Sequence, residues 1–263
     1  MEIITHSGHA HADEFLAISL LLYKFPNAIV RRVEKVGPSK GAILVDIGGK
    51  YKPPKYFDHH QDPNLPASFV LILKHFYNID YDDLPRNYQF YDSKDKVGIG
   101  RASREWDKIF ILSPVETTIL KIFSERSEIR PGDPLHNIMI EIGRGILKEL
   151  NSYITALDHI KDYIRTPDGY ILFLDDPDIS IPGILERFNG RVIGIVKPDS
   201  RNPQYTDILS VGNNPIFRPS DYLEEEAIFT HKSGFLRSVK MKPEEAWSRL
   251  KQIIESKGRA LYV

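Results

Sequence analysis

Short apolar runs alternate with longer segments of helical periodicity along the first hundred residues. Runs at 3–5, 28–33, 42–45 and 56–57 are typical of strands, and segments at 13–23, 66–77 and 81–95 are typical of helices. In the first helix apolar residues occupy nearly every face, which indicates packing against a sheet on one side and cover on the other. Strand, helix, strand, strand at short intervals predicts a doubly wound parallel sheet flanked by helices.

The second half has a different pattern. Ser113, Pro114 and Glu116 predict a helix start with a serine cap, a first-turn proline and a capping box. A long periodic segment at 134–165 indicates one broken helix or two. Strands at 170–174, 191–196, 205–211 and 227–229 and a closing helix at 243–256 follow. We therefore predict an α/β protein with an N-terminal domain at 1–132, a linking helical segment at 133–167 and a smaller α+β domain at 168–263.

Composition excludes several classes of protein. The chain has 263 residues, 41% of them hydrophobic and 27% charged, with a net charge of −1, so the whole molecule does not attract nucleic acid electrostatically. Without cysteine it has no disulfide, thiolate metal site or thiol nucleophile. No signal-peptide pattern opens the chain, and no apolar run approaches the ~18 residues of a membrane span. The sequence therefore predicts a cytoplasmic protein, with oligomerisation left open.

Histidine and acidic residues gather directly after three of the predicted strands. The runs are Thr5-His6-Ser7-Gly8-His9-Ala10-His11-Ala12-Asp13-Glu14, Val45-Asp46-Ile47-Gly48-Gly49 and Phe57-Asp58-His59-His60-Gln61. In an open α/β sheet such residues meet in the crevice at the carboxyl ends of the strands. Imidazole and carboxylate together suit Mn, Zn or Fe, and one carboxylate can bridge two ions. The pattern predicts a two-metal hydrolytic site.

These runs, and a fourth at 228–235, resemble the melanocyte proliferating gene family. That family is regarded as 3′–5′ RNA exonucleases and is similar to the wider DHH phosphoesterases. The resemblance implies a DHH-like N-terminal domain and a metal-dependent phosphodiesterase acting on single-stranded RNA or short oligonucleotides. It also implies two divalent ions as cofactors, with Mn²⁺ as the first expectation and Mg²⁺, Zn²⁺ or Co²⁺ as alternatives.

The resemblance further implies a set of metal ligands. One ion would be held by His6, His11 and Asp46, and the other by Asp13, Asp46, His59 and either Asp92 or Asp95. Asp46 would bridge the two ions. The family usually has an Asp-x-x-Asp pair followed by glycine, whereas an extra Lys-Val precedes the glycine here. The choice between Asp92 and Asp95 therefore stays open.

Other residues near these ligands have less specific roles. The family pattern leaves His60 to contact the scissile phosphate. Asp58 would either orient a ligand histidine or cap the strand end, and both interpretations stand. For Glu14 we favour a helix-start acid over a base behind the ligands. His9 lies inside the motif at a position where the family does not require histidine. Gly48 and Gly49 suit a tight turn, a close backbone approach to the metals, or both.

The downstream match implies a second binding site. His231, Ser233, Gly234 and Arg237, together with Arg218, would hold substrate phosphate through backbone N–H groups and cationic side chains. A solvated basic loop is the alternative. Two other functions remain open for the whole chain. The same metals could hydrolyse a small molecule such as pyrophosphate, a cyclic dinucleotide or a nucleotide, or the chain could bind metal without catalysis.

Overall fold

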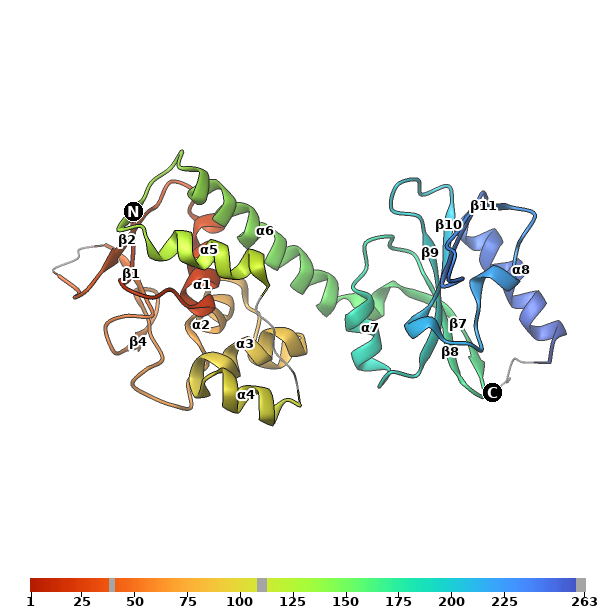
Figure 1. Cartoon of the computed structure of the whole chain (residues 1–263), viewed down its shortest axis with the longest axis horizontal. Helices are drawn as coiled ribbons and strands as arrows, with labels where there is room; N and C mark the ends of the chain where they lie inside the picture. Colours follow the sequence, from red (N-terminus) through yellow and green to blue (C-terminus); the bar gives the residue numbers. More distant parts are fainter. Residues whose placement is uncertain (38–40, 108–112, 259–263) are drawn as a thin grey trace. The chain divides into compact units, whose positions relative to one another are not determined.

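The computed structural model describes residues 1–37, 41–107 and 113–258, apart from the side chain of residue 213. The chain forms two compact units, Met1–Leu150 and Asn151–Val263, which Figure 1 draws from red to green and from green to blue. The finer division at residues 132 and 167 stays a prediction. Among the helices of the described residues, none has the length and apolar run that crossing a bilayer requires.

A six-stranded sheet organises the first unit. Its strands are β1 (Glu2–His6), β2 (Ile29–Val33), β3 (Ile43–Val45), β4 (Tyr51–Lys52), β5 (Tyr56–Phe57) and β6 (Glu128–Ile129), in the order β4-β5-β3-β1-β2-β6. The four central strands are parallel, whereas β4 and β6 pair antiparallel at the edges. The predicted parallel sheet is confirmed, and the two short edge strands are additions to it.

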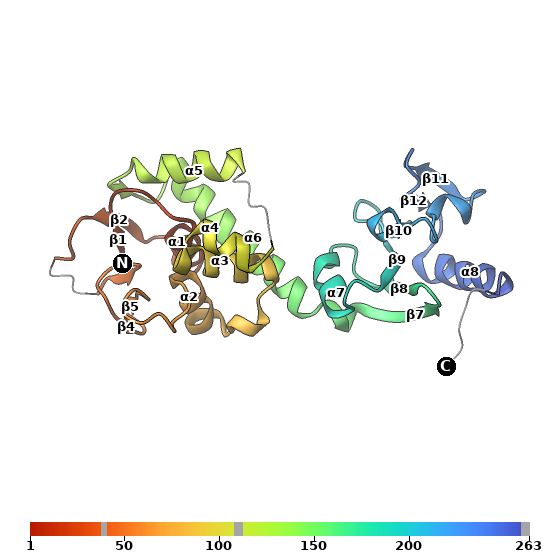
Figure 2. The same cartoon turned by 60° about the horizontal axis from the view of Figure 1, so that its bottom comes forward.

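The first helix of the chain packs against several other helices of its unit. The helices of this unit are α1 (Ala12–Lys24), α2 (Ser68–Tyr77), α3 (Arg86–Val97), α4 (Ile99–Glu105), α5 (Pro114–Ser124) and α6 (Pro134–Ile154), with a 3-10 turn η1 (Tyr81–Asp83). Figures 1 and 2 both show α1 between α2 and α5. The rings of Phe15 on α1 and Phe123 on α5 meet edge to face at 5.4 Å. The all-round apolar pattern of α1 reflects this enclosure.

The second unit has its own mixed sheet. Its strands are β7 (Ile160–Thr166), β8 (Gly169–Leu174), β9 (Val192–Pro198), β10 (Thr206–Ser210), β11 (Ala227–Thr230) and β12 (Leu236–Val239), in the order β11-β12-β10-β9-β8-β7. Only the β8–β9 pair is parallel among the described strands of this sheet. Helices α7 (Ile181–Arg187) and α8 (Pro243–Ser256) accompany it, with 3-10 turns η2 (Ala156–His159), η3 (Val211–Asn213) and η4 (Pro219–Asp221). Trp247 of α8 stacks on Phe173 of β8 at 5.5 Å.

The prediction of helix throughout 134–165 was wrong in its last part. Helix α6 ends at Ile154, and residues 160–166 form β7, which pairs antiparallel with β8. Ile164 and Thr166 are buried while Arg165 between them is exposed, the two-residue period of a strand. Ile160 and Ile164 are four residues apart, a spacing that fits both a strand and a helix. Only pairing with β8 distinguishes the two.

Two details of the predicted helices also differ. Pro85 separates η1 from α3, so residues 81–95 are not one helix; proline has no backbone N–H to continue the ladder. The serine cap of α5 is confirmed, since Ser113 Oγ accepts from the Val115 N–H at 3.3 Å. The expected capping box does not form because the Glu116 carboxylate accepts from the Tyr91 hydroxyl at 3.0 Å instead.

A close approach of α6 to α1 at Gly143 gives a stability prediction. A Cβ at Gly143 would lie 2.2 Å from the Ser19 carbonyl oxygen, whereas one at Gly145 would meet nothing within 4 Å. We expect Gly143→Ala to lower the free energy of unfolding by about 1–3 kcal/mol through overpacking. Gly145→Ala should raise it by about 1 kcal/mol because alanine favours helix. Urea unfolding of both variants measures this, and equal shifts would contradict the close packing.

Candidate metal centre

The polar runs after three strands meet at one edge of the first sheet. His6 is the last residue of β1, Asp46 follows β3, and His59 follows β5. Since these strands are parallel neighbours, their carboxyl ends lie side by side. Of the residues implied by the sequence, the structure gathers the following here: His6, His11, Asp13, Asp46, Asp58, His59, His60 and Asp95.

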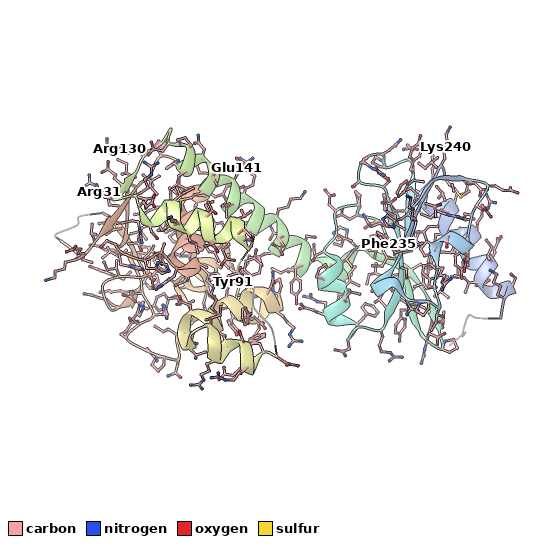
Figure 3. All side chains as sticks on the ribbon, viewed as in Figure 1. Arg31, Tyr91, Arg130, Glu141, Phe235 and Lys240 are labelled. Carbon is pink, nitrogen blue, oxygen red and sulfur yellow. The ribbon has the colours of Figure 1, made fainter. Side chains whose placement is uncertain are left out.

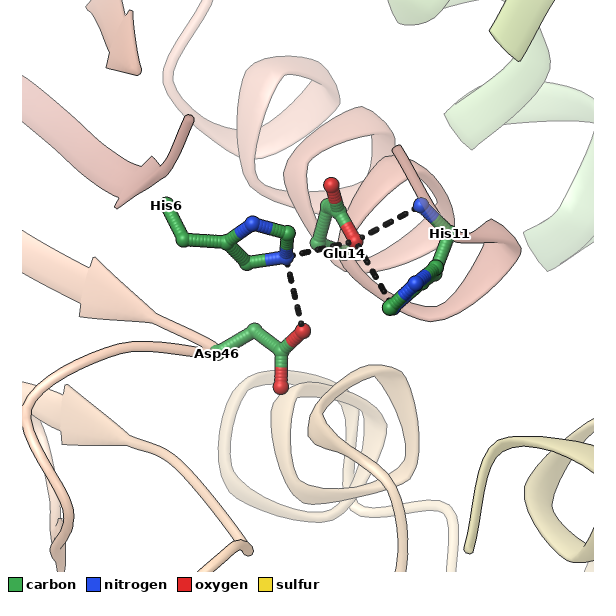
Figure 4. A group of neighbouring side chains, drawn as sticks. All are labelled: His6, His11, Glu14 and Asp46. Atoms are coloured by element: carbon green, nitrogen blue, oxygen red, sulfur yellow. Dashed lines mark hydrogen bonds and ion pairs between the residues drawn. The ribbon is translucent and has the colours of Figure 1, made fainter. Parts of the chain in front are cut away.

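One group of possible ligands forms around His6. Its Nε2 lies 3.1 Å from Glu14 Oε2 and 3.4 Å from Asp46 Oδ2, as Figure 4 shows. The backbone N–H of His11 donates to the same Glu14 oxygen at 2.9 Å, and the His11 ring is half exposed. One ligand atom from each of these four side chains lies within 4.8 Å of the others. Such a set could hold one divalent ion.

A second group forms around His59. Its Nε2 lies 3.0 Å from Asp95 Oδ2, 3.4 Å from Asp46 Oδ1 and 3.7 Å from Asp13 Oδ2. Asp46 therefore faces His6 with one carboxylate oxygen and His59 with the other. A carboxylate placed in this way is suited to bridge two ions.

Buried polar atoms in this cluster fit a metal-binding role. Asp46 Oδ2 and His59 Nε2 are both inaccessible to solvent and make no hydrogen bond. A buried polar atom without a partner costs free energy, and a buried charge costs more. Divalent cations coordinated by these atoms would remove that cost. The mixed carboxylate and imidazole donors suit Mn²⁺, Zn²⁺ or Fe²⁺.

The neighbouring carboxylates shift the pKa values of the histidines in the direction expected of a site that attracts cations. The nearby carboxylate of Asp46, and then that of Glu14, raises the pKa of His6 to about 10. Burial lowers the pKa of His59, but Asp46 and Asp95 outweigh it and raise that pKa to about 10. Burial and the Asp95 charge raise the pKa of Asp13. Burial also acts to raise the pKa of Asp46, but His59 and His6 hold it below its usual range.

Contacts with the N-terminus of α2 distinguish Asp92 from Asp95. The N–H groups of Ser68 and Phe69 donate to the two oxygens of Asp13, at 2.9 and 2.7 Å. The N–H of Ala67 donates to Asp92 Oδ1 at 2.6 Å. Asp92 thus caps a helix, whereas Asp95 contacts His59. Of the two aspartates that the sequence left open, the structure brings Asp95 to the cluster.

Asp58 fixes His60 in place. Its Oδ2 accepts the Gly49 N–H at 2.6 Å, while Oδ1 accepts the His60 N–H at 3.0 Å and lies 2.8 Å from His60 Nδ1. The histidine that Asp58 contacts is thus His60, which the resemblance does not include among the metal ligands, and both interpretations of Asp58 stay predictions. Gly48 and Gly49 both have positive φ, as a tight turn requires, whereas the close backbone approach to the metals stays a prediction. The His60 side chain is 61% exposed at the edge of the cluster.

Sequence reasoning missed the partner of Glu14. This residue forms the reciprocal capping box of α1 with His11, as a helix-start acid does. It is also fully buried, and its Oε1 lies 3.2 Å from Arg32 Nη2. The Arg32 guanidinium lies 4.5 Å from the Phe123 ring centre and donates to the Phe123 carbonyl. The signal was the Arg31-Arg32 pair inside a strand, because alternation requires one of two neighbours to point inwards.

The five residues implied in the second unit have different surroundings. Arg218, Ser233 and Gly234 line one pocket of about 220 Å³. His231 is exposed; its Nδ1 lies 2.9 Å from Ser233 Oγ. Arg237 is buried in β12 and donates to the Tyr222 carbonyl at 2.6 Å and to Thr230 Oγ1 at 3.0 Å. These contacts give Arg237 a structural position, whereas the other residues are accessible to a ligand.

Substitutions at Asp95 and Asp92 should show that the first is a metal ligand and the second a helix cap. Asp95→Ala should lower the metal content of the purified protein with little loss of stability, because it removes the oxygen nearest His59. Asp92→Ala should lower the free energy of unfolding by about 1–3 kcal/mol because it leaves the buried Ala67 N–H without a partner. Metal analysis and urea unfolding of both variants check this. The reverse pattern would make Asp92 the ligand.

Comparison with known proteins matches the N-terminal segment. Residues 2–69 match the model of the MYG1_exonuc family, described as Uncharacterised protein family (UPF0160). The chain is 45% identical over 89 residues to a MYG1 protein of Schizosaccharomyces pombe, covering 29% of this chain and 28% of the relative. It is 44% identical over 61 residues to the MYG1 exonuclease of Mus musculus, covering 22% and 16%. The matched segment thus spans less than a third of either relative.

Solved structures give weaker overall similarity. The pGpG-specific phosphodiesterase PggH from Vibrio cholerae superposes with a TM-score of 0.32 and 11% identity, covering 97% of both chains. RecJ from Thermus thermophilus in complex with Mn²⁺ gives 0.32 and 11%, covering 97% of this chain and 52% of that one. Scores of this size do not establish a shared fold. The sequence matches confirm the resemblance to the MYG1 exonuclease family over the N-terminal segment, residues 2–69.

Proposed function

We propose that this chain is a metal-dependent phosphodiesterase that removes nucleotides from the 3′ end of single-stranded RNA or short oligonucleotides. The observation that carries this proposal is the position of Asp46, which faces His6 with one oxygen and His59 with the other. The match of residues 2–69 to an exonuclease family supports the substrate class. The mixed donors favour Mn²⁺, with Mg²⁺, Zn²⁺ or Co²⁺ as alternatives.

The proposed ligands fall into two sets that share Asp46. His6, His11 and Asp46, with Glu14 beside them, would hold one ion. Asp13, Asp46, His59 and Asp95 would hold the other, since His59 Nε2 lies within 3.7 Å of an oxygen of each of the three carboxylates. When bound, two such ions supply Lewis acidity on both sides of a scissile phosphate.

His60 is the proposed contact to the reacting phosphate. Asp58 Oδ1 lies at the ring's Nδ1, which leaves Nε2 as the nitrogen that reaches a substrate oxygen. The Asp58 carboxylate is itself fixed by the Gly49 N–H, so the orientation of the ring is set before substrate binds. Asp58 is therefore a positioning residue in this proposal, acting through His60.

The second unit would hold a phosphate away from the reaction. Arg218 offers a guanidinium to the pocket it shares with Ser233 and Gly234. The N–H groups of Gly234 and Ser233 donate within the loop, to the carbonyl oxygen and to Nδ1 of His231, so the Arg218 side chain is the group proposed to meet the phosphate. A charge-assisted contact at this pocket would add binding energy for an oligonucleotide that a small ester lacks.

A substrate screen with Asp46→Asn tests the proposed function. The wild-type chain with Mn²⁺ should shorten 3′-extended RNA one nucleotide at a time, and Asp46→Asn should abolish hydrolysis and lower metal content. Asparagine tolerates the positive φ of 56° at this position, so the substitution isolates the charge. The exposed Asp82→Asn is the matched control and should behave as wild type. Labelled RNA, labelled DNA and pyrophosphate are compared as substrates.

Each rival function has its own outcome in that screen. Cleavage of pyrophosphate with RNA left intact would make the chain a small-molecule phosphohydrolase. Two bound metals without hydrolysis of any substrate would make it a metal-binding protein. Near-wild-type turnover by Asp46→Asn with both metals retained would remove the bridging role of this carboxylate.

Substitution of Arg218 and of Arg237 should distinguish a residue that binds substrate from one that stabilises the fold. Arg218→Ala should lower kcat/KM for single-stranded RNA about ten- to a hundredfold, the equivalent of roughly 1.5–3 kcal/mol for one charge-assisted contact. It should leave hydrolysis of a p-nitrophenyl phosphodiester unchanged. Arg237→Ala should instead lower the unfolding midpoint, since its side chain holds Tyr222 and Thr230. An equal fall on both substrates for Arg218→Ala would place Arg218 at the reaction centre.

A further inference from the structure

A pocket of about 350 Å³ opens beside the metal centre within the first unit. Three of its lining residues belong to the two ligand sets, namely His11, Asp13 and Asp95. A ligand in this pocket therefore reaches the centre directly. Its volume lies in the range of about 300–1,000 Å³ that is typical of small-molecule sites.

The remaining wall is mostly apolar, with one tyrosine. It comes from residues 9–12 and from α3, the start of α4 and α5, and on these helices it includes Tyr91, Lys94, Ile99 and Leu120. Ile99 is a large apolar side chain that is 42% exposed. An apolar wall next to a charged metal site suits a ligand with an anionic end and an apolar, planar end.

The Tyr91 ring is held in a defined orientation. Its hydroxyl donates to Glu116 Oε2 at 3.0 Å, which ties α3 to α5; Figure 3 labels Tyr91 where these helices face each other. Lys94 Nζ lies 3.5 Å from Glu116 Oε1 and 5.2 Å from the centre of the Tyr91 ring. The ring is half-buried and lines the pocket. A ring fixed in advance loses little conformational entropy when a planar ligand stacks against it.

We propose that this pocket binds the base and sugar of the terminal nucleotide while its phosphate lies at the metal centre. The ligand class is a nucleoside 5′-monophosphate, the product that 3′–5′ hydrolysis releases. The biological substrate in this inference rests on the proposed function, but binding of a nucleoside monophosphate in the pocket can be tested without any cleavage. A base held by Tyr91 and Ile99 sets which phosphodiester lies at the centre. Such a pocket would limit each hydrolysis to the terminal nucleotide.

The test is a binding comparison that does not require turnover. Isothermal titration of the Mn²⁺-loaded chain measures affinity for AMP, ribose 5-phosphate and inorganic phosphate. We expect AMP to bind at least about fivefold more tightly than ribose 5-phosphate, as a stacked base should. Ile99→Asn and Tyr91→Leu should each reduce that ratio severalfold without changing metal content or affinity for inorganic phosphate. Val115→Asn is the matched control, since Val115 is 74% exposed on α5 and lies outside the pocket.

The possible results separate this inference from the proposed function. Equal affinities for AMP and ribose 5-phosphate in the wild type, or an unchanged ratio in both pocket variants, would overturn the nucleoside pocket even if RNA is cleaved. A ratio that falls in both variants while no oligonucleotide is cleaved would support the pocket and reject the exonuclease. A ratio that falls equally in Val115→Asn would place the base elsewhere and overturn the assignment.

Discussion

The carboxylate of Asp46 is the contact on which the rest of the centre depends. It follows β3 with a left-handed backbone, a conformation that aspartate tolerates better than most residues. This turn places one oxygen against His6 and the other against His59, which come from the strands on either side. Two histidine groups that are far apart in the sequence thus share one buried charge. The parallel order β5-β3-β1 is what makes the shared position possible.

The other buried carboxylates each have a partner that the fold supplies. Glu14 is paired with Arg32, Asp13 accepts two N–H groups from the start of α2, and Asp58 accepts the Gly49 N–H. Such contacts stabilise a negative charge away from water. Among the described residues of the centre, the buried atoms left without a hydrogen bond are one oxygen of Asp46 and Nε2 of His59. These atoms without a hydrogen-bond partner therefore lie where the two ligand sets meet, at the position proposed for the cations.

The family match covers most, but not all, of this arrangement. Residues 2–69 include β1 to β5 and the first turn of α2, whose Phe69 N–H donates to Asp13. Asp95 and the aromatic wall at Tyr91 lie beyond the match, on α3. The reaction chemistry that we propose therefore lies mainly within the matched segment. The features that we propose for substrate recognition lie outside it, on α3–α5 of the first unit and in the Arg218 pocket of the second.

The amino-acid sequence by itself predicted the parallel sheet and the convergence of its strand-end histidines and carboxylates, because the apolar strand runs and the polar residues that follow them are local features of the chain. Other choices depended on contacts between distant segments. Asp92 and Asp95 lie one helical turn apart, and only the position of α2 turns the first into a cap and leaves the second at His59. Arg237 reads as a basic loop residue until β12 pairs on both sides and buries it. The sequence specifies the chemical type of each side chain, but tertiary packing decides which groups that side chain contacts.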